Sequence, residues 1–394
     1  MADRPPESPS PSPPSAPPTD RFLAALQEAG RLQPVLVPLY AVFVALVVAG
    51  VVIVIIGKNP FDAYWALLRG MFGGTDRIAA SLGRSTPFIG AALAVAFAFK
   101  AGLFNIGAEG QLLVGATLAA WVGTFSWLAG APGVVLAPTL LVAGVVGGGI
   151  WGGIPGWLKA RTGAHEVITT IMLNSIAILF IRWMVGSRDP VILRDMSASV
   201  PRSAIIPKAA RLPELVSSQP PLHLGFLVMI ALCALVWFTL RRTTFGFEVR
   251  TVGTNPNAAK YAGMSVNRTI VAVMAISGAL AGLAGAGEIA GTSGFLSPGV
   301  FTAIGFDAIA IALLARSNPY AIILTSILWG SMLSGAGLMQ QEAGLSIDAV
   351  RIVQALVLLF VAADVIVRWL FRMRREGAGG LEPAQMSVGW GSGS

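Results

Sequence analysis

Residues 132–153 read PGVVLAPTLLVAGVVGGGIWGG, a run without any charged side chain. An α-helix rises ~1.5 Å per residue, so a helix of this length crosses the ~30 Å hydrocarbon core of a bilayer. About ten such apolar runs, each near twenty residues long, follow one another between Val35 and Leu370. No water-soluble domain needs so many, so the sequence predicts an all-α polytopic membrane protein with about ten transmembrane helices.

The predicted spans are 35–56, 78–99, 107–129, 132–153, 166–186, 222–240, 268–290, 301–315, 319–338 and 347–370. The run 301–315 is too short to cross a bilayer alone unless its helix is broken, tilted or extended. The spans form a membrane domain over 35–370. Residues 1–34 are predicted to be a disordered tail and lead-in, rich in Pro and Ser at their start, and residues 371–394 a C-terminal tail.

The composition agrees with a helical bundle in lipid. The chain is 55% hydrophobic and only 12% charged, and it has 46 glycines. Glycine lets helix backbones approach closely where the hydrophobic effect no longer drives helices together. We interpret the glycine-rich runs 147–149 and 278–282 as packing surfaces and not phosphate loops, because neither is followed by Lys-Ser or Lys-Thr.

The sequence predicts no catalytic residue, no metal site and no cofactor on this chain. The nucleotide-binding motif G-x-x-x-x-G-K-[ST] is absent, so any ATP and Mg²⁺ would be bound by a separate subunit. Cys233 is the only cysteine, and His165 and His223 are far apart in sequence. His165 and Glu166 begin an H-E-x-x-H pattern, but Thr169 stands where the second zinc-binding histidine is required. A membrane enzyme is therefore not predicted.

Basic residues predict the orientation of the chain. The net charge is +8, spread over short loops, and cytoplasmic loops of membrane proteins are enriched in Lys and Arg. With ten crossings, three basic groups fall on the same side as the amino terminus: Lys159 and Arg161; Arg241, Arg242, Arg250, Lys260 and Arg268; Arg372, Arg374 and Arg375. We predict that this side is cytoplasmic, that both termini lie there, and that the loop 187–221 is external.

Ten spans with both ends on one side divide into five plus five, and an odd number per half gives the halves opposite orientations. Two sequence echoes support such an inverted repeat. Residues 106–109 (IGAE) open the third span and 304–307 (IGFD) lie in the eighth, while Asn59-Pro60 follows the first span and Asn255-Pro256 the sixth. Inverted repeats with broken helices are a transporter architecture, with the substrate path near the repeat interface.

The loop 241–267 contains one short helix with clear start and stop signals. Asn255 can accept from the free amides of the first turn, Pro256 suits the first helical position, and Gly263 suits a left-handed stop. Two interpretations remain open: a docking element for a cytoplasmic partner, or a helix lying at the lipid headgroups. A similar capped helix is predicted over 59–73 on the outer face, as part of an interfacial aromatic belt or as a rest for a substrate-delivery protein.

Polar residues inside the spans are candidates for a substrate path, because a charge at the centre of a spanning helix costs ~2.5–3.5 kcal/mol. Glu109, with Asn105 and Gln111 nearby, predicts either a broken helix facing a polar cavity or a helix start with structural hydrogen bonds. Glu166 begins a span and fits a first-turn acid. Asn174 lies mid-span and must hydrogen-bond to another helix or to substrate.

Four stretches resemble one family. Residues 250–264 (RTVGTNPNAAKYAGM) resemble the cytoplasmic coupling segment of ABC importer permeases of the simple-sugar and nucleoside branch, and 102–111 (GLFNIGAEGQ) resemble that branch's best-known signature. Residues 166–174 (EVITTIMLN) are a third match, and 306–314 (FDAIAIALL) with Asn318-Pro319 a fourth. The resemblance runs from about residue 35 to 370. One departure is His165, where the family pattern leads us to expect Asn.

The resemblance implies a permease subunit that imports nucleosides or related simple sugars through a bacterial cytoplasmic (inner) membrane. Its implied partners are a separate ABC ATPase subunit, a second permease subunit of related but different sequence, an extracytoplasmic substrate-binding protein and the lipid bilayer; nucleic acid is not among them. An ion-gradient-driven secondary transporter of a small polar solute, which needs no ATPase, is the alternative.

Two sets of site residues follow from the motifs. The substrate-path candidates are Asn105, Glu109, Gln111, Asn174, Phe306 and Asp307. The residues implied to couple the permease to an ATPase are Gly253, Asn255, Pro256, Ala258, Ala259, Tyr261 and Gly263, all in the predicted coupling loop 241–267.

Overall fold

A computed structural model describes residues 40, 42–125, 130–299 and 303–362. The chain divides into two compact units, one over residues 48–358 and one made of residues 1–47 and 359–394. In the second unit the described residues, 40, 42–47 and 359–362, are helical. The predicted tails 1–34 and 371–394 lie outside the described residues.

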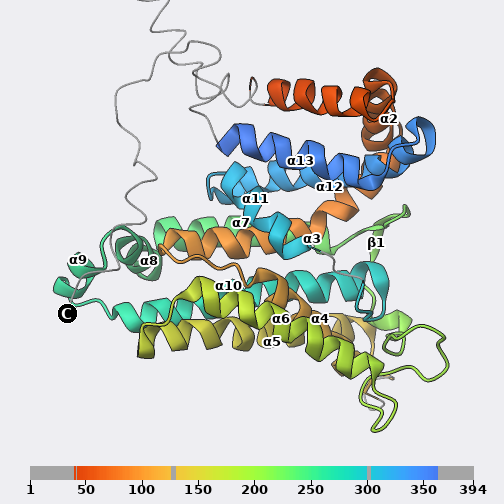
Figure 1. Ribbon diagram of the computed structural model, residues 1–394. Coiled ribbons are helices and arrows are strands. Elements are labelled where there is room, and N and C mark those ends of the chain that lie inside the picture. The colour runs from red at the N-terminus through yellow and green to blue at the C-terminus, as the bar shows by residue number, and fades with distance from the viewer. Residues whose placement is uncertain (1–39, 41, 126–129, 300–302, 363–394) are drawn as a thin grey trace, which may run out of the picture. The chain divides into compact units, whose positions relative to one another are not determined.

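The unit 48–358 is built from helices, with one small sheet (Figure 1). Its long helices are α3 (Thr75–Lys100), α5 (Gly133–Thr162), α6 (Glu166–Gly186), α7 (Gly225–Arg242), α10 (Val266–Glu288) and α12 (Pro319–Ala343). The shorter ones are α2 (Pro60–Phe72), α4 (Ala108–Gly123), α8 (Thr244–Thr254), α9 (Pro256–Tyr261), α11 (Ile304–Leu314) and α13 (Ile347–Ala362), whose last residues belong to the other unit. The strands β1 (Glu214–Val216) and β2 (Leu222–His223) pair antiparallel, the 3₁₀ turn η2 (Lys208–Ala210) precedes them, and α10 continues into the π-helical turn η3 (Ile289–Ser293).

The long helices confirm an all-α polytopic membrane fold. In the part of the chain that the structure describes, six helices are long and apolar enough to cross a bilayer, and they correspond to the predicted spans 78–99, 132–153, 166–186, 222–240, 268–290 and 319–338. A helix over Val42–Ile55 and α2, bent by 120° relative to each other, meet the same length and hydropathy criteria when taken together as one broken span. The predicted spans 107–129 and 301–315 contain the shorter helices α4 and α11, and 347–370 runs past the described residues. The count of ten stays a prediction.

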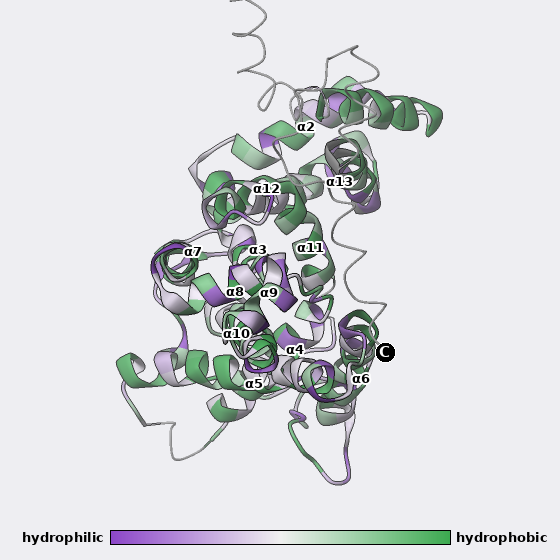
Figure 2. Ribbon diagram, turned by 90° about the vertical axis from the view of Figure 1, so that its left-hand side faces the viewer, coloured by the Kyte–Doolittle hydropathy of each residue, from purple (hydrophilic) through white to green (hydrophobic). Residues whose placement is uncertain are grey.

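The long helices carry apolar side chains on the outside as well as the inside. Figure 2 shows mainly apolar colour along them, and large apolar side chains such as Leu179, Leu324 and Ile150 are exposed. Exposed apolar surface on helices of this length is what a hydrocarbon solvent requires, since lipid tails are as apolar as leucine.

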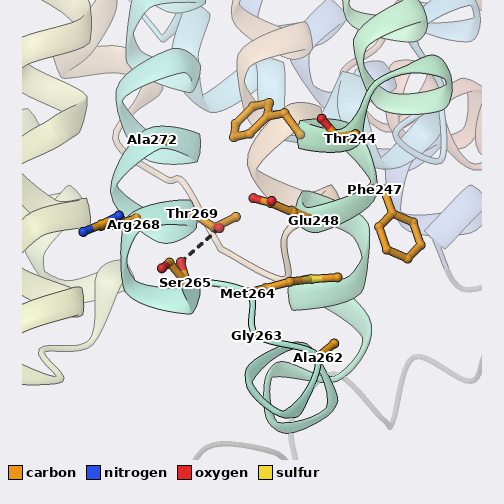
Figure 3. Close-up of a pocket in the computed structure, with 11 residues that line it drawn as sticks. Thr244, Phe247, Glu248, Ala262, Gly263, Met264, Ser265, Arg268, Thr269 and Ala272 are labelled. Carbon is orange, nitrogen blue, oxygen red and sulfur yellow. Dashed lines mark hydrogen bonds between the residues drawn. The ribbon is translucent and has the colours of Figure 1, made fainter.

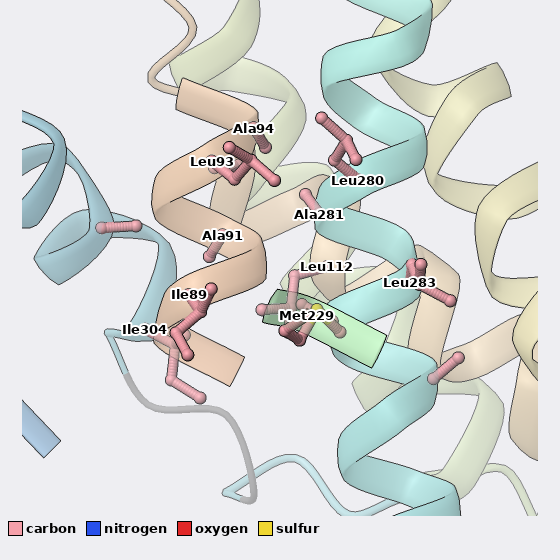
Figure 4. Close-up of a cluster of buried hydrophobic side chains, with 14 of the residues drawn as sticks. Ile89, Ala91, Leu93, Ala94, Leu112, Met229, Leu280, Ala281, Leu283 and Ile304 are labelled. Carbon is pink, nitrogen blue, oxygen red and sulfur yellow. The ribbon is translucent and has the colours of Figure 1, made fainter. Parts of the chain in front are cut away.

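Helix α3 is the centre of the bundle. It packs against α7, α10, α11 and α12, and its residues from Ala79 to Ala98 are almost all buried. Figure 4 shows α3 and α10 side by side, with Leu93 and Ala94 of α3 near Leu280 and Ala281 of α10.

Glycines bring α5 and α10 into backbone contact, as the sequence predicted for both glycine-rich runs. Gly144, Gly148, Gly152 and Gly156 recur every fourth residue and therefore share one face of α5. A Cβ on Gly148 would lie 2.2 Å from the carbonyl oxygen of Gly278 and 2.6 Å from the Cα of Gly282. Only glycine fits at such an approach, so the two runs are helix-packing surfaces.

Three short motifs begin helices in the same way. Asn59, Asn255 and Asn318 each accept, through the side-chain oxygen, a backbone N–H of the first turn of α2, α9 and α12. A proline at the first helical position follows each of them, where its missing N–H costs nothing. The predicted capped helices over 59–73 and 255–263 are therefore confirmed.

Candidate functional site

The segment between α7 and α10 folds as two short helices, α8 and α9. Thr243 caps the start of α8 by accepting from the N–H of Gly246. Asn255 is the single residue between α8 and α9, and its side chain caps α9 by accepting from the N–H of Ala258 at 3.0 Å. Gly263 has φ +80°, a left-handed conformation that ends the short helix. Ala259 is fully buried, whereas Tyr261 is 94% exposed. A short, capped helix therefore presents an exposed aromatic side chain.

A groove of about 600 Å³ lies beside this short helix. It runs between α8 and the start of α10 and is lined by Thr244, Phe245, Phe247, Glu248, Ala262, Gly263, Met264, Ser265, Arg268, Thr269 and Ala272. Figure 3 shows Glu248 pointing from α8 toward α10, with Met264 below it. The groove has both apolar and charged lining, as a contact surface for a protein segment has.

Helix α8 touches the turn that follows α3. A Cβ on Gly253 would lie 2.3 Å from the carbonyl oxygen of Lys100 and 2.9 Å from the Cα of Ala101. On the other side of this contact, Gly102 adopts φ +70° and packs against the backbone of Gly253. The predicted coupling segment is therefore in direct contact with the start of the motif at 102–111.

That motif leads into a buried polar cluster, which we define as Asn105, Glu109, Gln111, Asn174 and Ser277. Asn105 is fully buried, and its Nδ2 donates to Gln111 Oε1 at 2.8 Å and to Ser277 Oγ at 2.7 Å. Gln111 Nε2 donates back to Asn105 Oδ1 at 3.0 Å. Ser277 Oγ in turn donates to the carbonyl of Ala94 at 2.7 Å. The loop before α4, α4 itself, α10 and α3 are thereby joined by one hydrogen-bond network.

Glu109 of the cluster reaches the start of α11. Its two carboxylate oxygens accept from the N–H of Ala303 at 3.2 Å and of Gly305 at 2.5 Å, and the side chain is only 4% exposed. The first amides of a helix lack partners within the helix and carry partial positive charge, so they stabilise a carboxylate there. The contact brings the IGAE and IGFD echoes of the sequence together.

Asn174 connects α6 to the same region. Its Oδ1 accepts from the N–H of Gly110 at 2.8 Å, and its Nδ2 donates to the carbonyl of Ile106 at 2.9 Å. The expected hydrogen bond from Asn174 to another segment of the bundle is confirmed.

Glu166 lies at the first turn of α6, as predicted for a first-turn acid, and it also has a specific partner. Lys159 Nζ at the end of α5 donates to Glu166 Oε2 at 2.6 Å, and both side chains are at most 10% exposed. The N–H of Phe104 donates more weakly to the other oxygen, at 3.4 Å. The neighbouring His165 precedes α6 without a side-chain capping bond, in line with its departure from the expected Asn.

Four of the six substrate-path candidates meet in the polar cluster. The other two, Phe306 and Asp307, lie on α11 beside the amides that Glu109 binds; Phe306 is 47% exposed and Asp307 is half-buried. The seven predicted coupling residues lie together in 253–263, outside the cluster. Sequence reasoning missed Ser277 as a partner of Asn105, because a serine in a small-residue helix gives no distinctive signal.

Among the described residues, no group of three or more His, Cys, Asp or Glu side chains is arranged to hold a metal ion.

Apolar helices of bilayer length around a buried, hydrogen-bonded polar cluster define a polytopic membrane protein. The model of the family described as branched-chain amino acid transport system / permease component matches residues 77–362. The chain therefore belongs to this family of ABC transporter permeases, and it is a transport subunit and not an enzyme.

Curated relatives cover nearly the whole membrane domain. The chain is 40% identical to the guanosine ABC transporter permease protein NupP of Bacillus subtilis over 88% of its own length and 99% of that protein. It is 35% identical to a glucose ABC transporter permease protein of Haloferax volcanii, over 89% and 93% of the two chains. It is 33% identical to the nucleoside ABC transporter permease protein NupB of Lactococcus lactis, over 86% and 93%. No solved structure matches the sequence significantly.

Proposed function

We propose that this chain is the permease subunit of an ABC importer that carries nucleosides, or simple sugars related to them, across a bacterial cytoplasmic membrane. The observation that carries the proposal is the contact between Gly253 of α8 and the turn at 101–102. It links an exposed, capped helix to a buried polar cluster shared by several long helices. The names of the relatives support the solute class, and the guanosine permease favours a nucleoside.

The partners follow from this assignment. An ABC ATPase subunit, which binds the ATP and Mg²⁺, docks on α9 and in the groove between α8 and α10. Tyr261 is its anchor, since exposed aromatic side chains are enriched among the residues that dominate binding energy at interfaces. A second permease subunit, related but different in sequence, completes the membrane part, and an extracytoplasmic binding protein delivers the solute.

The membrane topology that fits this function is ten spans in two inverted halves of five, with both termini in the cytoplasm. The contact of Glu109 with residues 303–305 supports the repeat, because equivalent segments of two halves related by a two-fold axis meet near that axis. The basic residues of 241–268 support a cytoplasmic location for α8 and α9.

The mechanism is alternating access, with motion transmitted from the ATPase. When the ATPase closes, it moves α9 and α8 together, since Asn255 joins them through a short cap. The close contact at Gly253 then moves the turn at 101–102, and the hydrogen bonds of Asn105 pass the movement to α3, α4 and α10. ATP can drive this change only because the ATPase binds the two permease conformations with different affinity.

Replacement of the exposed anchor tests the docking site. We expect Tyr261→Ala to reduce the amount of ATPase that copurifies with the tagged permease by about tenfold or more, because an interface anchor contributes ~2 kcal/mol or more. The matched control is Phe61→Ala, which removes an exposed aromatic side chain from α2, another helix that begins with Asn-Pro. If both variants retain the ATPase equally, docking on α9 is contradicted.

A further inference from the structure

Two charged side chains lie inside the most buried helices and take no part in the polar cluster. Arg84 is exposed, although every other residue of α3 from Ala79 to Ala98 is buried or half-buried. Glu288 is half-buried at the end of α10, whereas all other residues from Leu280 of α10 to Gly291 of η3 are buried. In each of these buried stretches, the charged side chain is therefore the most solvent-accessible one.

Helices α3 and α10 run antiparallel, because Ser277 Oγ donates to the carbonyl of Ala94 and Gly90 packs on Ala284. Arg84 and Glu288 therefore lie at the same level of the two packed helices, where their charges interact. The carboxylate of Glu288 also accepts a hydrogen bond from the side chain of Thr292 in η3. Thr292 Oγ1 lies 3.5 Å from Nε2 of His223, a fully buried ring whose Nδ1 accepts from the N–H of Gly225 at 3.1 Å. Glu288 is therefore supported on one side by a chain of polar contacts.

The imidazole of His223 is a fixed, neutral part of this support. Burial lowers the pKa of His223 to about 4, so the ring is uncharged at neutral pH. Because Nδ1 accepts the N–H of Gly225, the neutral ring carries its proton on Nε2, which faces Oγ1 of Thr292. The Thr292 hydroxyl can then accept from the imidazole and donate its own proton to the carboxylate of Glu288. A Cβ on Gly291 would lie 2.2 Å from the ring, so glycine is required for η3 to wrap around it.

The pair lies at the end of the bundle away from α8 and α9. Arg84 comes sixteen residues before Lys100, which contacts Gly253, so it is ~24 Å along α3 from that contact. Glu288 is likewise ~33 Å along α10 from Val266. Next to Arg84, Gly83 packs on the backbone of Pro221, in the predicted external loop. Charged groups at such positions face water or a partner and not lipid, and mark solute pathways.

We infer that Arg84 and Glu288 form a solute-binding station in the outer half of the transport path, and that it takes the vicinal hydroxyls of the solute. This inference rests on the proposed function. Glu288 offers two acceptor oxygens to two neighbouring hydroxyls, and the guanidinium of Arg84 donates to the oxygen atoms of the same group. Because the two charges cancel, the station suits an uncharged solute such as a ribonucleoside.

Replacing Arg84 and Glu288 by neutral glutamine tests whether the two side chains bind solute or only neutralise each other's charge. The whole importer, with its ATPase and second permease, is reconstituted in vesicles, and ATP-driven uptake of guanosine is compared with that of 2′-deoxyguanosine. We expect Arg84→Gln and Glu288→Gln each to reduce guanosine uptake at limiting concentration by about tenfold, and Glu288→Gln to abolish any preference for the ribonucleoside. The double variant should be no better than the poorer single variant. The matched control is Arg77→Gln, two turns earlier on α3 and exposed, which should leave uptake unchanged.

A double variant that transports within twofold of the wild type would overturn the inference, because the two charges would then serve only to neutralise each other. Basal ATP hydrolysis by each variant complex verifies assembly. A wild-type complex that fails to take up guanosine would instead refute the proposed solute class. Normal wild-type uptake with unaffected variants would refute the station alone.

Accessibility provides a measurement that does not depend on transport by the neutral variants. In a Cys233→Ser background, Arg84→Cys should react with a membrane-impermeant thiol reagent added from the extracytoplasmic side, and saturating guanosine should slow the reaction at least fivefold. Arg77→Cys should react at the same rate with and without guanosine. An Arg84→Cys thiol that is inert, or that guanosine does not protect, contradicts a solute station at this position.

Discussion

Gly282→Leu is expected to prevent the membrane domain from reaching its folded state. A Cβ at this position would lie 2.2 Å from the carbonyl oxygen of Gly144 and 2.8 Å from the Cα of Gly148. Helix α4 also approaches this position, because a Cβ on Gly115 would lie 2.3 Å from the Cα of Gly282. The backbones of α4 and α5 therefore both pack closely on α10 here. Overpacking of a tight core typically costs ~1–3 kcal/mol. Backbone contacts from two helices leave no rotamer to escape, so we expect more than ~4 kcal/mol, a large part of the stability of a typical domain.

The measurement is the yield of monodisperse protein from mild detergent, read by size-exclusion chromatography. Gly282→Ala should give an intermediate yield, because a methyl group meets the same backbone atoms. The matched control is Gly337→Leu on α12, an exposed position with nothing within 4 Å of its Cβ, where an added apolar side chain suits lipid. Equal yields of Gly282→Leu and Gly337→Leu would contradict the close packing of α10 on α4 and α5.

Gly253→Leu is expected to uncouple ATP hydrolysis from transport. The added side chain meets the backbone of Lys100 and Ala101, so α8 must move away from the turn at 101–102. The exposed face of α9 is unchanged, and the ATPase should still bind and hydrolyse ATP. We expect uptake to fall by about a hundredfold, since misplacing a transmission contact by about 1 Å is enough to disrupt a coupled step.

Uptake and ATP hydrolysis are measured on the same reconstituted complexes. The control is Thr254→Ala, one residue further along α8, whose exposed hydroxyl only donates to the carbonyl of Arg250 within its own helix. It should transport like the wild type. If Gly253→Leu transports normally, or if it loses the ATPase altogether, the proposal that this contact transmits motion to the membrane domain is contradicted.

Local signals predicted the local structure well. Asn255, Pro256 and Gly263 define the start and stop of α9 through their own backbone preferences, so the helix was predictable without tertiary information. The glycine runs were likewise predictable as packing surfaces, since a lipid solvent gives glycine few other uses in a spanning helix. Six long spans followed from hydropathy and length alone.

Partners distant in sequence were not predictable. The polar character of Glu109 was evident, but its partners Ala303 and Gly305 are nearly two hundred residues away and offer only backbone amides, which carry no sequence signal. The same limit applied to Asn105 and Ser277. For Asn174 the need for a hydrogen bond followed from burial in lipid, whereas the identity of Gly110 and Ile106 as partners required the fold.

The candidate site was predicted as two sets of residues without a connection between them. The polar cluster and the segment 253–263 each carry a motif, but the contact that joins them depends on Gly253 and Gly102, two glycines whose role appears only when the backbones meet. The charge of Arg84 was visible as a lone basic residue in an apolar run, but Glu288, at the same level of α10, lies about two hundred residues further along the chain.

The most direct test of the account is the energy source of transport. The permease is reconstituted in sealed vesicles with and without its ATPase and second permease subunit, and guanosine uptake is followed under a proton or sodium gradient and, separately, with ATP at the cytoplasmic face. We predict uptake only from the complete complex, only with hydrolysable ATP, and none from any ion gradient. Uptake by the chain alone, driven by an ion gradient without nucleotide, would contradict the account and identify a secondary transporter.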